Sequence, residues 1–161
     1  MKKILLIFGL TAGIVLGAKM RIPVEPVPFT MQTLFVLLLC FKYPPIVSTG
    51  AVILYLLLGC FLPVFSGENY GKEVLLGPTS GYLLAFPVAA YLCSYSYQRI
   101  QNKNWGIRFG LAASAHLLIL CFGVIGLILT TPLSFSEIML KGWIVLLPGA
   151  VIKSALVALV K

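Results

Sequence analysis

Lys153 is the residue of this sequence best suited to bind a ligand. It ends the segment Pro-Gly-Ala-Val-Ile-Lys at residues 148–153, where Pro148 could open the last helix. A helix N-terminus carries free N–H groups and a partial positive charge, and the lysine adds a full charge there. We therefore expect contact with a carboxylate or carbonyl group. The alternative is a lysine whose charge simply extends to the surface.

Two further segments collect polar residues. Residues 26–32 end in Gln32, whose amide could bond a ligand or another helix. Residues 63–82 form a longer stretch that is either a lid or binding loop, or a solvated connection, and its candidate residues are Glu68, Asn69, Tyr70 and Tyr82. If the three segments meet at one end of an apolar bundle, they predict a pocket for a small amphiphilic solute.

The remaining reactive side chains exclude several kinds of chemistry. All four acids are Glu, there is no Asp, and no P-loop occurs, so this chain does not bind ATP in the P-loop manner. The single histidine, His116, rules out multi-histidine metal sites. The four cysteines lie far apart in apolar runs and are interpreted as small hydrophobic residues. No basic stretch is interleaved with aromatics, which argues against nucleic acid as a partner.

The elements that position these residues are predicted to be membrane helices. The 161 residues are 60% hydrophobic and 10% charged, with a mean hydropathy of +1.06, whereas soluble domains have about 45–50% apolar and about 25% charged residues. We expect an all-α membrane protein with one transmembrane domain, residues 1–161. Its six transmembrane helices should cover about residues 4–18, 30–41, 46–62, 78–97, 107–130 and 145–160.

Loop charges predict that both termini are cytoplasmic. With the N-terminus inside, seven basic residues face the cytoplasm and four face outward; the seven are Lys2, Lys3, Lys42, Arg99, Lys103, Arg108 and Lys161. Ser134 and Glu137 have capping-box spacing, which predicts a short interfacial helix before the last span. The first 20 residues also resemble a cleavable signal peptide. Retaining them as a transmembrane helix gives an even number of spans, which favours the six-helix interpretation.

Gly9, Gly13 and Gly17 recur every four residues in the first span. On one helix they form a flat groove that another backbone can approach closely. The spacing fits packing inside the bundle and docking of a partner equally well.

Several segments together resemble the BioY proteins, the biotin-binding S components of energy-coupling factor (ECF) transporters. Residues 26–34, PVPFTMQTL, resemble the family pattern P-x-P-x-T-x-Q-T-L, and residues 75–83, LLGPTSGYL, resemble L-x-G-P-T-G-G-Y-L. Residues 148–153 resemble P-G-D-x-x-K, and residues 55–59 and 62–65 also match. The matches run in order from the first span to the last.

The resemblance implies a six-helix S component in the bacterial inner (plasma) membrane that binds biotin from outside. Biotin is then the transported ligand, no cofactor is needed, and the chain is not an enzyme. The implied partners are a transmembrane coupling subunit, which the glycine stripe would meet, and two ATPase subunits. Lys153 would contact the biotin carboxylate or ureido carbonyl, whereas hydrogen bonds and ring stacking would come from Asn69, Glu68 and Gln32, and from Tyr70 or Tyr82.

Some residues depart from the family pattern. The family aspartate is Ala150 here, Ser80 and Ala85 replace usual glycines, and Glu68 and Tyr70 stand where glycine is common. Losing the aspartate removes an acceptor for the ureido N–H groups, for which Glu68 or Asn69 could compensate. The departure favours, as an alternative, an S component or solitary transporter for another small vitamin.

Two other classes of protein are rivals. An intramembrane hydrolase would use Ser114 with His116, but residues two apart on a helix do not face each other. A purely structural membrane subunit would bind no ligand, and a thermal-shift measurement distinguishes it.

Overall fold

The apolar runs of the sequence form six main helices joined by short elements. The computed structural model describes residues 2–160. Its elements in chain order are α1 (Lys2–Lys19), β1 (Arg21–Ile22), β2 (Phe29–Thr30), α2 (Gln32–Lys42), α3 (Pro45–Gly59), α4 (Lys72–Leu75), α5 (Ser80–Arg99), α6 (Trp105–Thr130), α7 (Phe135–Met139), the π-helical turn η1 (Leu140–Ile144) and α8 (Leu147–Leu159). The six predicted helices are therefore confirmed, with shifts at their ends.

The short helix α2 lies at the centre of the bundle. It contacts α1, α3, α5, α6 and α8, and Val36, Leu37 and Cys40 on it are fully buried. Pro44 and Pro45 separate α2 from α3, because proline disfavours helix in the residue before it and lacks a backbone donor. Eleven residues span only about 16 Å, so α2 is a buried helix shielded by its neighbours rather than a full span.

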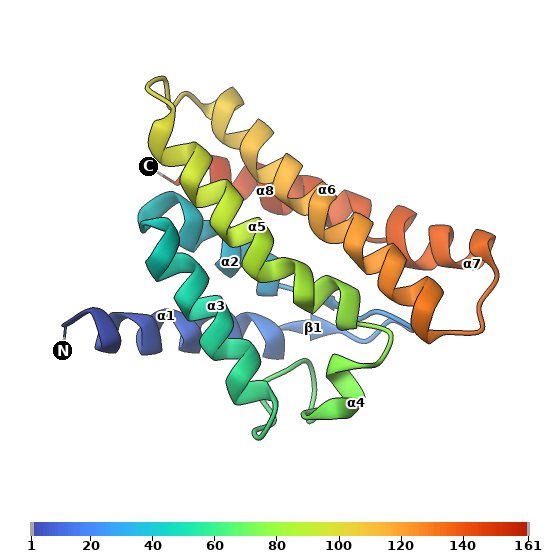
Figure 1. Cartoon of the computed structure of the whole chain (residues 1–161). Helices are drawn as coiled ribbons and strands as arrows, with labels where there is room; N and C mark the ends of the chain where they lie inside the picture. Colours follow the sequence, from blue (N-terminus) through green and yellow to red (C-terminus); the bar gives the residue numbers. More distant parts are fainter. Residues whose placement is uncertain (1, 161) are drawn as a thin grey trace.

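The bundle has two unlike ends. In Figure 1, α1 begins and α8 ends on the side that also holds the α2–α3 and α5–α6 turns. The opposite end holds the β1–β2 hairpin, α4 and α7. The start of α1 and the end of α8 thus lie on one side of the bundle. Lys161, which was assigned to the cytoplasmic face, lies outside the described residues.

The third predicted span ends three residues early, because the following loop folds back on it. Gly71 N donates to Gly59 O at 2.7 Å, and the ring of Phe65 packs against Gly59 and, edge to face, against Tyr55 at 5.4 Å between centroids. Residues 60–62 therefore form a turn. The small elements β1, β2 and α4 were not predicted, since two to four residues are too few for a periodic pattern.

The last span differs more from the prediction. The capping box is present: Glu137 N donates to Ser134 Oγ at 3.4 Å, and Ser134 N donates to Glu137 Oε2 at 3.0 Å. However, the helical backbone continues from Phe135 to Leu159, and Ala150 N donates to Leu146 O at 3.0 Å. Within this segment α8 begins at Leu147, with Leu146 as its N-cap and Pro148 in its first turn, so the predicted helix start at Pro148 is confirmed to within one residue.

Apolar side chains cover much of the outside of the bundle. Leu84, Leu92, Ile125, Leu129 and Ile152 are all exposed, a pattern that suits a lipid environment. Trp105–Thr130 and Phe135–Leu159 are long and apolar enough to cross a bilayer, and Gln32–Lys42 and Pro45–Gly59 are shorter apolar helices. Buried polar side chains at the hairpin end include Thr30, Gln32 and Lys153, whereas Ser48 and Ser94 bond the carbonyl of Tyr43 at the opposite end.

Helices α5 and α6 cross in direct backbone contact at the hairpin end. A Cβ on Gly126 would lie 2.7 Å from Gly81 N and 2.8 Å from Gly81 Cα, and a Cβ on Gly81 would meet the carbonyl oxygen of Phe122. Small residues permit such close approach between membrane helices. This contact sets the separation of two helices that carry Tyr82 and His116.

We expect Gly126→Ala to destabilise the bundle by about 1–3 kcal/mol, the usual cost of overpacking. The added methyl group would force apart the backbones of α5 and α6. The measurement is the thermal unfolding midpoint of the protein in detergent, and Gly110→Ala on the same helix is the control, since nothing lies within 4 Å of a Cβ at Gly110. Equal midpoints for the two variants would contradict the prediction.

Candidate functional site

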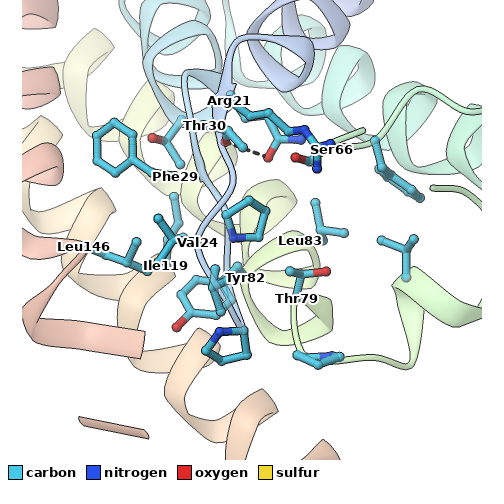
Figure 2. A pocket seen from close by; sticks show the side chains of 18 of the residues that line it. Arg21, Val24, Phe29, Thr30, Ser66, Thr79, Tyr82, Leu83, Ile119 and Leu146 are labelled. Carbon is cyan, nitrogen blue, oxygen red and sulfur yellow. Dashed lines mark hydrogen bonds between the residues drawn. The ribbon is translucent and has the colours of Figure 1, made fainter. Parts of the chain in front are cut away.

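A cavity of about 730 Å³ lies at the end of the bundle that holds the hairpin. The hairpin and its connecting turn, the loop before α4, and residues of α5, α6 and α8 all line it. Figure 2 shows the hairpin ribbon passing through the middle of the view, with Phe29, Ile119 and Leu146 on one side and Ser66, Thr79 and Leu83 on the other. This volume suits a small-molecule ligand.

Lys153 is the buried cation of this cavity. Its side chain is 7% exposed and lines the cavity from α8. Nζ donates to Thr30 O at 3.0 Å and to Thr33 Oγ1 at 2.9 Å, and it lies 4.6 Å from the centroid of the Phe29 ring. Because an ammonium has three N–H donors, one remains for a ligand. Lys153 lies in the second turn of α8, near the helix start at Leu147, and lines the cavity. Its role as a ligand-binding residue stays a prediction.

Gln32 forms the polar floor beside Lys153. Its Oε1 accepts from Thr30 Oγ1 at 3.2 Å, and its Nε2 donates to Tyr55 Oη at 2.5 Å. Both amide ends are therefore oriented by the protein, and one N–H of the amide is left for a ligand. The bond to Tyr55 confirms the alternative in which Gln32 bonds another helix. Because the side chain also lines the cavity, its contact with a ligand stays a prediction.

Aromatic and aliphatic groups form the cavity walls. The ring of Tyr82 lines the cavity, while its hydroxyl donates to Gly142 O in η1 at 2.6 Å. This bond uses the hydroxyl to hold α5 against η1, so that Tyr82 offers the ligand an apolar ring face. The other apolar wall residues include Phe29, Phe65, Phe86, Ile119, Leu120 and Leu146.

The structure brings together four of the six predicted ligand-binding residues. Lys153, Gln32, Tyr82 and Asn69 line the cavity, and Asn69 Nδ2 also donates to Ser66 O at 3.4 Å. Glu68 and Tyr70 are exposed and do not line the cavity. Both side chains are exposed on the loop that Phe65, itself 1% exposed, anchors against the bundle.

Sequence reasoning missed several lining residues, among them Arg21, Glu25, Thr33, Glu73 and His116. Arg21 and Glu25 belong to the unpredicted hairpin, in which Arg21 pairs with Thr30. Lys19 supports this region, since its Nζ donates to the carbonyls of Pro63 and Gly67. The sequence signal for Arg21, Glu25 and Thr33 was their closeness to the segment at residues 26–32.

Ser114 and His116 do not face each other, as helix geometry predicted. Ser114 is exposed, and its Oγ donates to Gly110 O of its own helix at 2.8 Å. His116 is buried and lies 2.8 Å from Ser154 Oγ on α8. The serine and the histidine considered for a hydrolase therefore form no nucleophile–base pair.

The three glycines of α1 have different surroundings. Gly17 is buried, and a Cβ there would lie 3.0 Å from Met31 O, so Gly17 packs within the bundle. A Cβ on Gly13 would make an ordinary contact with Phe35 at 3.5 Å, and a Cβ on Gly9 would meet nothing within 4 Å. Of these three glycines, Gly9 and Gly13 therefore leave room for a partner helix, whereas Gly17 does not.

An apolar outer surface around a helical bundle, with a polar-floored cavity at one end, is typical of membrane proteins that bind a small solute. A solved structure described as the S-component for biotin from an ECF-type ABC transporter has the same fold, with a TM-score of 0.86 and 25% identity over 99% of this chain and 88% of that chain. The chain belongs to the BioY family, whose sequence model matches residues 1–161.

Named relatives agree with this assignment. The chain is 41% identical to the biotin transporter BioY of Thermotoga maritima over 63% of this chain and 61% of that protein. It is 36% identical to the biotin transporter BioY2 of Lactococcus lactis subsp. cremoris over 87% of this chain and 77% of that protein. The match therefore spans less than two thirds of the Thermotoga protein.

Proposed function

We propose that this protein is a biotin-binding S component that takes up biotin across the bacterial plasma membrane. The observation that carries the proposal is the cavity at the hairpin end, where a buried lysine with one free N–H faces apolar walls. Biotin combines a polar cyclic urea and a carboxylate with an apolar fused ring and chain, and the cavity offers matching polar and apolar groups. The relatives' names and the S-component fold support the same ligand.

The proposed roles follow the polarity of the lining. Lys153 donates its remaining N–H to a biotin oxygen, and Gln32 and Asn69 add hydrogen bonds to polar atoms. The Tyr82 ring packs on the bicyclic ring. These groups bind and position a solute, and we assign the chain no catalytic residue.

Transport also needs an energy source that this chain lacks, since its sequence has no P-loop. We infer that a transmembrane coupling subunit and two ATPase subunits supply it, and that Gly9 and Gly13 on α1 contact the coupling subunit. With the coupling subunit on the cytoplasmic side, the hairpin end of the bundle and its cavity face outward. The start of α1 and the end of α8 then face the cytoplasm. Lys2 and Lys3 at the start of α1 fit that orientation under the positive-inside rule.

The decisive test is equilibrium binding by the purified protein in detergent, with labelled biotin displaced by biotin, desthiobiotin, thiamine or riboflavin. We expect displacement by biotin, weaker displacement by desthiobiotin, and none by thiamine or riboflavin at equal concentration. Failure to bind biotin would overturn the proposal.

Another small vitamin is the second candidate ligand, and Ala150 is the observation that favours it. Ala150 lines the cavity. Its methyl group offers no hydrogen-bond acceptor, whereas the BioY pattern P-G-D-x-x-K has an aspartate at this position. Displacement of a labelled probe by thiamine or riboflavin, but not by biotin, would support this candidate.

A further inference from the structure

His116, the single histidine of the sequence, lies in the cavity wall. It is 3% exposed and lines the cavity from α6, as Ala150 and Lys153 do from α8. Its two ring nitrogens have very different surroundings, and these surroundings assign the imidazole proton.

The hydrogen-bond partners place the proton on Nδ1. This nitrogen lies 3.2 Å from Ala112 O and 2.8 Å from Ser154 Oγ. A carbonyl oxygen only accepts, so Nδ1 must be the donor. The hydroxyl of Ser154 donates its proton to Ala150 O at 2.8 Å, which leaves the Ser154 oxygen free to accept from Nδ1–H.

The other nitrogen, Nε2, is then an acceptor without a donor. It is buried and has no hydrogen-bond partner among the described residues. Buried polar atoms are nearly always paired, and an unpaired one weakens a structure markedly. Because Nδ1 is used by Ala112 O and Ser154 Oγ and the residue belongs to the cavity lining, Nε2 is the polar atom that His116 has left for a ligand.

We propose that Nε2 of His116 accepts a hydrogen bond from a urea N–H of bound biotin. This inference rests on the proposed function and identifies the acceptor that the cavity needs. A cyclic urea presents a carbonyl acceptor flanked by N–H donors. Lys153 supplies a donor for the carbonyl oxygen, and the neighbouring residue Ser154 holds the imidazole that supplies an acceptor. Ala150, on the same wall, has only a methyl group to offer.

Two substitutions separate the two edges of the imidazole. His116→Asn keeps a polar group near the Nδ1 position, which contacts Ser154, but removes the acceptor at the Nε2 position. His116→Gln places an amide near the Nε2 position and removes the Nδ1 bond. We expect the Asn variant to bind biotin about 10- to 100-fold more weakly than wild type, because a urea N–H is left buried and unpaired. The Gln variant should lose no more than a few-fold in affinity while unfolding at a lower temperature.

A biotin analogue with one urea N–H replaced by N–CH₃ provides the second arm. Wild type should bind biotin at least 10-fold more tightly than the analogue methylated at the nitrogen that faces His116, so both single methylations are compared. The Asn variant should lose most of this discrimination. Such coupling between ligand and protein changes is the result that supports the proposal.

Three results would overturn it. If the wild-type protein binds biotin and both methylated analogues equally well, no protein group accepts a hydrogen bond from a urea N–H. This measurement uses the wild-type protein alone and does not depend on the folding of a variant. An Asn variant that binds biotin as wild type does, or a Gln variant that binds less well than the Asn variant, shows that His116 acts only through Nδ1. If wild type fails to bind biotin at all, the proposed function falls and this inference falls with it, an outcome distinct from the other results.

Discussion

Replacing Lys153 with alanine is expected to weaken biotin binding about 10- to 100-fold, the range that corresponds to losing one hydrogen bond to a charged group. The substitution removes the free N–H that we assign to a biotin oxygen. It also leaves Thr30 O and Thr33 Oγ1 without their donor, so that the hairpin loses an anchor to α8. Isothermal titration of the purified protein in detergent measures the change.

Two controls separate charge from position. Lys141→Ala removes the same charge from an exposed residue that pairs with Glu137 at 3.8 Å, and its biotin affinity should equal that of wild type. Thr33→Val removes one of the partners that hold the ammonium but keeps its charge, so we expect a loss of only a few-fold. If Lys153→Ala binds as tightly as Lys141→Ala, Lys153 does not contact the ligand.

Gly13→Leu and Gly9→Leu on α1 should leave biotin affinity within about two-fold of wild type and abolish most biotin uptake by cells. Both positions lie away from the cavity and accept a Cβ without a clash. A leucine there would separate α1 from a closely packed partner helix, and we expect association with the coupling subunit to fall about 10- to 100-fold, since overpacking costs about 1–3 kcal/mol. Uptake of labelled biotin and co-purification of the partner subunits measure the effect.

Gly110→Leu is the matched control, because Gly110 is another helical glycine with nothing within 4 Å of an added Cβ. It should alter neither binding nor uptake. Normal biotin uptake by both α1 variants would contradict the proposal that Gly9 and Gly13 contact the coupling subunit. Loss of biotin binding by these variants would show instead that α1 packing holds the cavity in shape.

The positions of the main helices could be predicted because hydrophobic length and proline are local properties. Pro44 and Pro45 end one helix and begin the next whatever surrounds them, and the capping box of Ser134 and Glu137 forms within four residues. Helix ends that depend on distant contacts were misplaced. The third span stops at Gly59 because residues 65 and 71, far along the loop, pack and bond against it.

The ligand-binding candidates divide in the same way. Lys153, Gln32, Asn69 and Tyr82 could be selected from the sequence, because a polar or aromatic residue beside an apolar span needs a partner. Their partners could not be selected. Lys153 bonds Thr30 across 123 positions of the chain, and Tyr82 bonds Gly142 across 60 positions. Neither the spacing nor the periodicity of the sequence predicts such distant pairs.

The sequence alone determined a six-helix membrane protein of the BioY pattern, with chemistry concentrated in three segments. Composition and local motifs carry that information, because they require no knowledge of which helices touch. Only the tertiary structure decided that Glu68 and Tyr70 do not line the cavity although Asn69 does, that Gly17 packs inward, and that His116, whose Nε2 is buried and unpaired, belongs to the cavity lining. Each of these outcomes depends on packing between segments distant in the chain, and packing directions are set by the whole bundle.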